Sequence, residues 1–402
     1  MAGADFDLCI AGGGPAGMVA GLLFARAGVS TLVVEKHSDF LRDFRGDTVH
    51  PSTLTVFHEL GLLDALLKLP HQKLRQLGGR IAGRTFKLVD FRALPGPAPY
   101  IALMPQWDLL DFIAREARRY PCFTLRQDCE AAGLIEGEGR VAGIQLAGGG
   151  EVRARLAIAA DGRHSVLRKA SGLPLEELGA PMDVFWFRIA KTFQPDSETL
   201  GVFAPGKVIV FIDRGDYYQC AFVFAKGSAD SVRGEGIELF RERVRSAAPD
   251  IAGGVDSVRS WDDVKLLTVS INRLREWSRP GLLVIGDAAH AMSPMGGVGI
   301  NLAVQDAVAA ANLLAGPMAA GADPDPLLPR LQERRMKPTR RTQRLQIAMQ
   351  NRVVAPLLRP EARLDKPPLA ARLFDALPLL RRIPGRIIGL GFQPEHVRSP
   401  SA

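Results

Sequence analysis

The sequence is poor in the residue patterns that build metal sites and disulfide frameworks. Its four cysteines, Cys9, Cys122, Cys129 and Cys220, have no CxxC spacing, and none of the seven histidines has a partner at HxxxH spacing. Scattered cysteines of this kind predict reduced, structural thiols. Because no cluster of ligands is present in the sequence, we expect no bound metal.

Long apolar runs are also lacking. No stretch approaches the ~20 uninterrupted apolar residues of a membrane-spanning helix. The apolar segment near the N-terminus follows Asp5 and Asp7 and is interrupted by glycine and proline at 12–15, which is unlike a secretion signal. We therefore expect no transmembrane helix, and we expect a cytoplasmic protein.

Negative charge is scarce at one end of the chain. The net charge is +8, but residues 330–402 hold sixteen Lys and Arg against five Asp and Glu, so this segment carries +11 and the remainder carries −3. It lacks the interleaved aromatics of a nucleic-acid-binding surface. We predict basic helices at 331–402 that dock on the protein, with peripheral contact to an anionic membrane as the alternative and with no nucleic-acid partner.

The length of 402 residues predicts more than one lobe, since single cores stop growing near ~250 to 300 residues. Residues 5–36 are typical of a strand, a glycine turn, a helix and a second strand, and helices are predicted over 51–69 and 107–120. Strand-rich segments with aromatics follow from 182, interrupted by a helix at 236–247. An apolar strand then returns at 281–285, and a Gly- and Pro-rich break at 316–329 precedes the basic helices.

The fold class that follows is α/β, or α+β overall. We expect a Rossmann-type domain assembled from residues 1–75, 100–181 and 276–330. An antiparallel-sheet substrate domain, 76–99 and 182–275, is inserted into it, and 331–402 forms a basic C-terminal helical region.

A GxGxxG pattern stands between the first predicted strand and helix. Gly12 permits the tight turn, Gly14 lets the backbone approach a pyrophosphate, and Gly17 lets helix and strand pack closely. The helix N-terminus offers unpaired N–H groups to phosphates. Glu35 ends the next strand, where a carboxylate can accept hydrogen bonds from ribose hydroxyls. Together these features predict dinucleotide binding.

Two later motifs indicate which dinucleotide is bound. DGRHSVLR at 161–168 and GDAAHAMSPMGGVGINLAVQDA at 286–307 each follow an apolar strand. With the GxGxxG turn they resemble the FAD-binding motifs of the aromatic-ring (group A) flavoprotein monooxygenases, the family of p-hydroxybenzoate hydroxylase and the ubiquinone-biosynthesis hydroxylases. The resemblance runs in order along the whole chain, although the middle lobe matches only in its strand-rich texture.

The resemblance implies a set of residues that bind FAD. Gly286 and Asp287 would hold the ribityl chain, and Gly297, Gly299 and Asn301 would bring a helix N-terminus to the flavin ring. Such an N-terminus stabilises the negative charge of a reduced flavin.

Further roles follow from the same resemblance. Asp161 matches the segment that serves both FAD and NAD(P)H, Arg45 would meet the pyrophosphate, and Gln106 would lie beside FAD. The candidate catalytic residues are Pro294, in the segment that lines the flavin face, and His50. His50 either faces the flavin or is a helix cap or surface residue. His290 is expected to be structural.

The resemblance implies that transiently bound NADPH or NADH reduces FAD, and that O2 then forms a C4a-hydroperoxide that hydroxylates an electron-rich ring. The sequence has one GxGxxG and no second site of its own for NAD(P)H. The benzoate-binding Ser and Arg are missing from VIVFI at 208–212, and no tyrosine follows Tyr218. We therefore expect an apolar phenol, quinol or polyketide. A flavin-dependent reductase and a flavoprotein that only sequesters a ligand remain alternatives, and the sequence carries no signal of oligomeric state.

Overall fold

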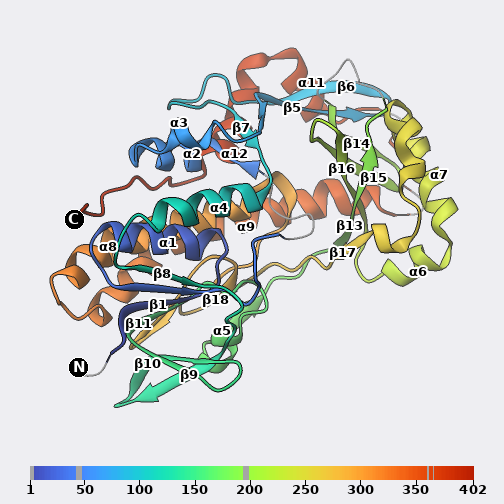
Figure 1. Ribbon diagram of the computed structural model, residues 1–402. Helices are drawn as coiled ribbons and strands as arrows, with labels where there is room; N and C mark the ends of the chain where they lie inside the picture. Colours follow the sequence, from blue (N-terminus) through green and yellow to red (C-terminus); the bar gives the residue numbers. More distant parts are fainter. Residues whose placement is uncertain (1–3, 42–47, 193–198, 360–361, 365) are drawn as a thin grey trace.

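The strands of the larger sheet come from distant parts of the chain. The computed structural model describes residues 4–41, 48–192, 199–359, 362–364 and 366–402. The sheet has the order β19, β20, β11, β1, β2, β8, and it is parallel from β20 to β8, while β10 and β9 extend it antiparallel from β11 (Figure 1). Its strands are β1 (Phe6–Ala11), β2 (Thr31–Val34), β8 (Phe123–Arg126), β9 (Ala131–Gly137), β10 (Arg140–Leu146), β11 (Glu151–Ala159), β19 (Ser278–Arg279) and β20 (Leu282–Val284).

The register of this sheet brings several strand ends to one edge. Ala11 at the end of β1 pairs with Ala159 at the end of β11, and Ala159 pairs with Val284 at the end of β20. The turns that follow these strands therefore meet at the carboxyl edge of the sheet, where ligands bind in folds of this kind.

Apolar helices cover one face of the larger sheet (Figure 1). They are α1 (Pro15–Arg26), α4 (Gln106–Ala117) and α8 (Gly299–Ala319), and their side chains share one core with β1 and β2. On the other side lie α5 (Val166–Ser171) and the β9–β10 hairpin. The predicted helix at 107–120 is confirmed by α4, and the predicted break at 316–329 begins only after Ala319, because α8 continues through Pro317.

The second sheet is built mainly from the middle of the sequence. Its order is β17, β13, β16, β15, β14, β5, β6, and all neighbours are antiparallel except β14 and β5. The strands are β5 (Gln76–Ile81), β6 (Arg84–Asp90), β13 (Met182–Ala190), β14 (Thr199–Ala204), β15 (Lys207–Asp213), β16 (Tyr217–Ala225) and β17 (Lys265–Leu267).

The aromatic residues of the second sheet form a core with a helix. α6 (Ala229–Gly234) and α7 (Ile237–Ala247) cover one face of the sheet (Figure 1). Phe187 and Phe222 of the sheet stack edge-on against Phe240 of α7, with ring centroids 5.1 and 5.4 Å apart. These aromatics therefore form the core of this lobe. The predicted helix at 236–247 is confirmed by α7.

Small elements connect the two sheets. They are the sheet of β3 (Thr48–Val49), β7 (Ile101–Leu103) and β4 (Gln72–Leu74), the pair β12 (Leu175–Glu177) and β18 (Asn272–Leu274), and the helices α2 (Pro51–Glu59) and α3 (Leu63–Leu66). The single helix predicted over 51–69 is wrong. Gly61, at a φ of +70°, breaks the segment into α2 and α3, because glycine adopts the left-handed conformation that ends a helix.

The C-terminal region begins as one long helix and ends as an extended segment. α9 (Leu328–Met349) passes into a π-turn (Gln350–Val354) and then α10 (Ala355–Leu357), α11 (Leu369–Ala376), a short 3-10 turn (Pro378–Arg381) and α12 (Arg382–Leu390). Residues 391–402 contain no helix and run back over the larger sheet's helices, where the N–H of Ala402 donates to the carbonyl of Arg26 at 2.9 Å. The C-terminal helices lie between residues 328 and 390, whereas 391–402 is extended, because this stretch satisfies its backbone groups on neighbouring helices.

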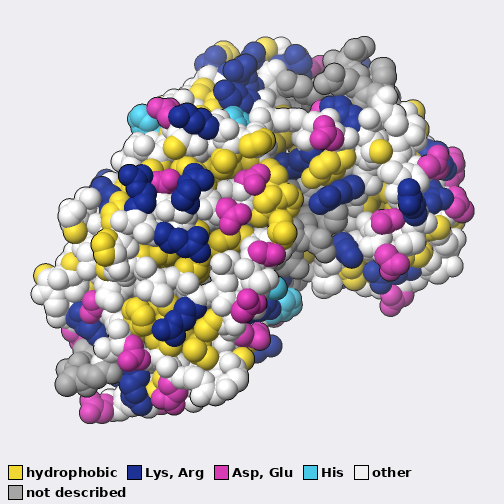
Figure 2. Space-filling model, viewed as in Figure 1, with side chains coloured by type: hydrophobic (Ala, Val, Ile, Leu, Met, Phe, Trp, Pro, Cys, Tyr) yellow, Lys and Arg dark blue, Asp and Glu magenta, His cyan; other side chains and the backbone are white. Residues whose placement is uncertain are grey.

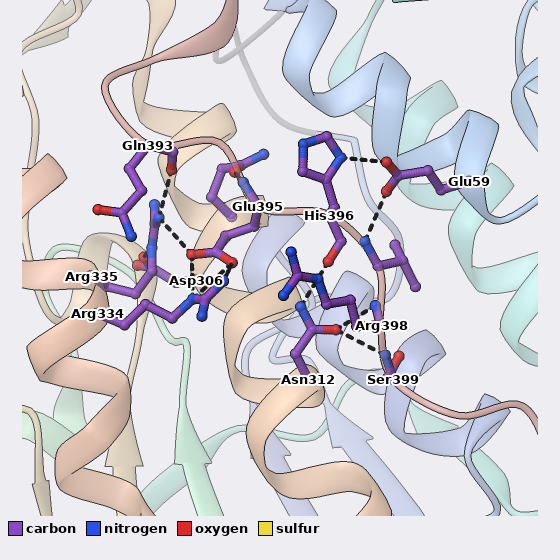
Figure 3. A network of polar contacts seen from close by, with 12 residues as sticks. Glu59, Asp306, Asn312, Arg334, Arg335, Gln393, Glu395, His396, Arg398 and Ser399 are labelled. Atoms are coloured by element: carbon purple, nitrogen blue, oxygen red, sulfur yellow. Dashed lines mark hydrogen bonds and ion pairs between the residues drawn. The ribbon is translucent and has the colours of Figure 1, made fainter.

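A buried ion network fastens that extended segment (Figure 3). The Arg335 guanidinium donates to Asp306 at 2.9 Å and to Glu395 at 3.2 Å, and all three side chains are buried. Asp306 also contacts His290 Nε2 at 2.6 Å and accepts from the N–H of Gly286 at 3.2 Å. Burial alone would raise the pKa of Asp306, but His290 and Arg335 outweigh it and hold that pKa below its ordinary value.

One described helix is long and apolar enough to span a membrane. It is the Met295–Ala319 segment that contains α8, and 72% of its most apolar window is buried inside the protein. Its burial identifies α8 as a core helix of the larger lobe.

Candidate active site

The glycine turn after β1 has the geometry of a phosphate-binding loop. Gly12 has a φ of +104°, and a Cβ there would meet the carbonyl oxygen of Ala160 at 2.4 Å. A Cβ at Gly17 would lie 1.9 Å from the oxygen of Gly12, so both positions require glycine. A Cβ at Gly14 would instead enter open space in front of α1. No side chain caps the α1 N-terminus and its first turn has no acidic residue, so the turn fits an anionic ligand.

Glu35 is held against the same turn. It is buried, and its Oε2 accepts from the N–H of Gly13 at 2.8 Å. Its Oε1 lies 2.6 Å from His37 Nδ1, a contact that the sequence reading did not foresee. Oε1 also accepts from the N–H of His37 at 3.2 Å, and a contact of Glu35 with a ribose stays a prediction.

The carboxylate of Asp161 is used within its own segment. It accepts from the hydroxyl of Ser165 and from the N–H groups of Val166 at 2.8 Å and Leu167 at 3.2 Å. Burial raises the pKa of Asp161 despite these bonds. Asp161 therefore caps the N-terminus of α5, and any contact of this residue with FAD or NAD(P)H remains a prediction.

Asp287 lies where the segments at 161–168 and 286–307 meet. Its Oδ2 is 3.6 Å from Arg163 Nη2, and its side chain is 34% exposed. Gly286, at a φ of +61°, brings this turn against Ala16 of α1, because a Cβ there would lie 3.0 Å from that of Ala16. A Cβ at Gly299 would lie 4.0 Å from Asp287 Oδ1, so the start of α8 adjoins this carboxylate.

The N-terminus of α8 is clamped to the start of α2. Asn301 Oδ1 accepts from the N–H of His50 at 3.1 Å and from Thr53 Oγ1 at 2.7 Å. Its Nδ2 donates to the carbonyl of Gly297 at 3.3 Å. Gly297 has a φ of +64°, and a Cβ there would lie 2.4 Å from Thr48 Oγ1. The side chain of Asn301 thus fixes the loop, while the backbone N–H groups at the α8 N-terminus remain suited to a flavin ring.

His50 is neither a surface residue nor a side-chain cap of α2. It is completely buried, and its Nδ1 lies 2.7 Å from the carbonyl of Ile388, so Nδ1 carries the proton. Nε2 has no hydrogen-bond partner among the described residues and would lie 3.4 Å from a Cβ at Gly297. Burial lowers the pKa of His50 to about 4, which the bond to Ile388 only partly offsets. His50 is therefore neutral and presents an acceptor toward the loop at Gly297.

The loop around Pro294 is held by a glutamine of α9. Gln346 Oε1 accepts from the N–H of Ser293 at 3.1 Å, and its Nε2 donates to the carbonyls of Ser293 and Met295, each at 3.0 Å. Pro294 lies between these two anchored residues and begins the 3-10 turn Met295–Gly297. We call residues 293–298 the flavin loop.

Two further glutamines extend this contact along α9. Gln343 donates to the carbonyl of Ala291 at 3.2 Å, and Gln350, in the π-turn, donates to Ser293 Oγ. Together with Gln346 they stand at positions i, i+3 and i+7, one face of a helix. These glutamines lie in the region that was predicted only as basic helices, although their spacing along one helix face could have predicted a buried polar contact.

A mainly apolar cleft of about 110 Å³ lies between the flavin loop, α9 and α12. Arg335 is the only cationic residue in the described lining of the cleft. Its guanidinium donates hydrogen bonds to the carboxylates of Asp306 and Glu395. Gln305 Oε1 accepts from the N–H of Glu395, which leaves Gln305 Nε2 as a buried donor without a partner in the described part of the chain. The lining residues are Ser52, Met295, Gly296, Val298, Asn301, Leu302, Gln305, Arg335, Pro338, Thr342, Leu345, Gln346, Met349, Ile387, Ile388, Leu390, Gly391, Phe392 and Gln393.

For two of the predicted cofactor-binding residues the structure gives no evidence of a role. Gln106 is the first residue of α4 and is only partly exposed, at some distance in sequence from the glycine turn. Arg45 lies outside the described residues. The contacts of both with FAD remain predictions.

A family profile described as an FAD binding domain matches residues 5–344. The chain belongs to this FAD-binding family. It is 34% identical to the 6-methylpretetramide 4-monooxygenase of Streptomyces rimosus over 404 residues, which cover 99% of this chain and 95% of that protein. It is 23% identical to the 3-demethoxyubiquinol 3-hydroxylase of Escherichia coli K12 over 352 residues, with 82% and 85% of the two chains covered. These relatives confirm the resemblance to the aromatic-ring flavoprotein monooxygenases, so the flavoprotein is an FAD-dependent oxidoreductase.

Solved structures confirm the fold. PqsL, a probable FAD-dependent monooxygenase from Pseudomonas aeruginosa, superimposes with a TM-score of 0.74 at 20% identity over 87% of this chain and 96% of its own. The OxyS anhydrotetracycline hydroxylase from Streptomyces rimosus gives a TM-score of 0.70 at 23% identity, covering 96% and 76%.

Proposed function

We propose that this flavoprotein hydroxylates an uncharged, polycyclic phenol of the polyketide type, consuming NAD(P)H and O2. The observation that carries the proposal is the cleft beside the flavin loop. Its described lining is mainly apolar, its polar side chains other than Arg335 are uncharged, and the guanidinium of Arg335 is neutralised by Asp306 and Glu395. A substrate carboxylate would therefore be buried without a partner, which costs several kcal/mol.

The size of the cleft favours a ring that enters edge-first. An apolar cavity of roughly 150 Å³ admits benzene, and the cleft measures about 110 Å³. The cleft is partly open to solvent, so it admits the edge of one ring of a fused system while the rest of the substrate lies outside it. Gln305 Nε2 supplies a donor for a phenolic or carbonyl oxygen of the inserted ring.

FAD, when bound, accepts a hydride from NAD(P)H and activates O2 for transfer of one oxygen atom. The chain's own residues orient the cofactor and the substrate and shield them from water. The α1 N-terminus binds the pyrophosphate, and the α8 N-terminus stabilises negative charge near the ring. The neutral imidazole of His50 offers Nε2 as a hydrogen-bond acceptor at the flavin loop, and the apolar lining of the cleft excludes water.

The second sheet supports an apolar substrate. Val210 and Ile212 of β15 pack in the apolar cluster that includes Ile388 and Leu390 of the cleft wall. These strand positions thus carry aliphatic side chains near the cleft, where a benzoate hydroxylase would need polar ones. The nearest arginine in sequence, Arg214, donates to Gln219 at 2.9 Å.

The test is NAD(P)H consumption by the FAD-loaded protein with matched pairs of neutral polycyclic phenols and their carboxylated analogues. Product mass after reaction under isotopically labelled O2 reports oxygen transfer. We expect neutral phenols to accelerate NAD(P)H oxidation and to gain one labelled oxygen. A product with a saturated double bond and no label would support the reductase alternative, and tight binding without turnover would support a ligand-sequestering role.

A further inference from the structure

Exposed aliphatic side chains gather on one part of the described structure. Twelve large hydrophobic side chains are exposed across the described residues, and five of them fall between residues 369 and 383. We call these five the apolar patch: Leu369 (68% exposed), Leu373 (43%), Leu377 (50%), Leu379 (69%) and Ile383 (57%). Single exposed hydrophobics are ordinary, but a cluster of this kind marks an interaction surface.

The helices that carry the apolar patch are fixed to the second sheet on their opposite side. Ala371 of α11 is buried with Ile81 and Phe86 of the sheet. α12 approaches β6 so closely that a Cβ at Gly385 would lie 2.2 Å from the carbonyl oxygen of Asp90. Because the inner faces are anchored in this way, the aliphatic side chains face outward as a consequence of docking and not of a frayed terminus.

The exposed charges beside the apolar patch are positive. Arg372, Arg382 and Arg386 are exposed on the same helices. Asp375, the acidic residue between them, is only partly exposed and lies 3.6 Å from Arg381, where it is neutralised. Figure 2 shows Lys and Arg side chains beside hydrophobic ones at the top of the molecule, where Figure 1 draws α11.

This combination selects among possible partners. A second copy of the chain would bring like-charged arginines together across the interface, which is unfavourable. Nucleic acid would neutralise the arginines but would leave five aliphatic side chains without apolar contact. An anionic lipid surface satisfies both sets, because its phosphates attract the guanidinium groups while its acyl boundary accepts the aliphatic side chains.

We propose that α11 and α12 dock the protein on an anionic lipid surface, with the apolar patch entering the headgroup region. Ile383 lies one turn before Ile387, which lines the cleft, so docking brings the cleft close to the lipid. If the proposed function holds, an apolar substrate could pass from lipid to cleft without crossing water. The docking itself does not depend on that function.

Co-sedimentation of the FAD-loaded full chain with vesicles tests the proposal. Vesicles of phosphatidylcholine with phosphatidylglycerol are compared with vesicles of phosphatidylcholine alone, at low and high salt. We expect binding to the anionic vesicles only, weakened by salt. The pair Leu379→Glu and Ile383→Glu should lower affinity at least about tenfold, and each of Arg372→Gln and Arg382→Gln by about fivefold.

The control variant is Leu239→Glu, which alters an exposed leucine of α7 (44% exposed) outside the apolar patch and should bind as the wild type does. Retained FAD absorbance shows that each variant is folded. The proposal is overturned if the wild type does not sediment with anionic vesicles, or if the paired glutamate variant sediments equally well. It is also overturned if the wild type is a dimer in solution that this variant converts to a monomer, since the apolar patch would then contact a second copy.

Discussion

Replacing Gln346 by leucine would remove the bonds between α9 and the flavin loop with little change in volume. The amide of Gln346 is buried and makes three hydrogen bonds, of 3.0 to 3.1 Å, to Ser293 and Met295. Each backbone group left unsatisfied costs about 1 to 3 kcal/mol, and these costs do not add fully. The loop will therefore shift to reach water or other partners.

We expect the shift to appear mainly in the reaction. If the shift of the loop raises the activation free energy by about 1.4 kcal/mol, kcat/KM falls tenfold. FAD occupancy should remain high, because the glycine turn is untouched. The measurement is steady-state kinetics with the best substrate, together with the visible spectrum of the bound flavin, which should change when the loop moves.

Gln332 provides the matched control. It lies on the same helix and also clamps backbone, accepting from the N–H of Trp277 at 2.8 Å and donating to the carbonyl of Arg275 at 2.7 Å, but it does not touch the flavin loop. Gln332→Leu should lower stability with less than about a twofold effect on kcat/KM. Equal kinetic losses in both variants, or a Gln346→Leu enzyme with unchanged kinetics and spectrum, would refute the assignment of a positioning role to Gln346.

Five other substitutions test the site and the residues that support it. Gly14→Val should abolish FAD binding in a folded protein, whereas Glu35→Ala should weaken it by about 1 to 3 kcal/mol, as measured by flavin titration; equal losses would contradict this division of roles. Asp287→Ala should lose most bound FAD on purification, and full occupancy would show that the ribityl assignment is mistaken. His50 has a folded pKa of about 4 against an ordinary 6.5, so the unfolded chain binds its proton first as pH falls; stability should decline by up to about 3 kcal/mol between pH 6.5 and 4, and His50→Asn should remove that part of the pH dependence of Tm. Arg335→Met should destabilise the protein by about 3 to 5 kcal/mol in denaturant unfolding, because two buried carboxylates lose their partner, and a loss below about 1 kcal/mol would show that the network is weak.

The sequence predicted the features that depend on neighbouring residues. The turn at Gly12 and Gly14 could be located because the strand, the turn and the helix that define it are contiguous. The inserted sheet was recognisable because β15 and β16 are segments rich in β-branched and aromatic residues that pair as a hairpin over a short stretch of chain. In both cases the signal is local.

The features that the sequence did not predict join residues far apart. Gln346 contacts Ser293 across 53 positions, and Arg335 contacts Glu395 across 60. The local pattern does not distinguish a buried arginine from an exposed one on a basic helix, and the spacing of the glutamines indicates a shared helix face but not the loop that this face contacts. The motif that contains Asp161 could be recognised from the sequence. The hydrogen bond that its carboxylate accepts from the start of α5 could not, because it depends on the packed geometry.

α9 has a mechanical consequence for the two lobes. Leu331 and Arg335 near its start are buried against the larger lobe, and Val354 and Leu357, just beyond its end, are buried against the second sheet. A nearly continuous helical rod therefore crosses the boundary between the lobes (Figure 1). Rotation of one lobe against the other would have to bend this rod or break one of its two anchorages. Large hinge opening is thus disfavoured, and substrate entry must rely on smaller movements, of which the π-turn at Gln350–Val354 is the natural pivot.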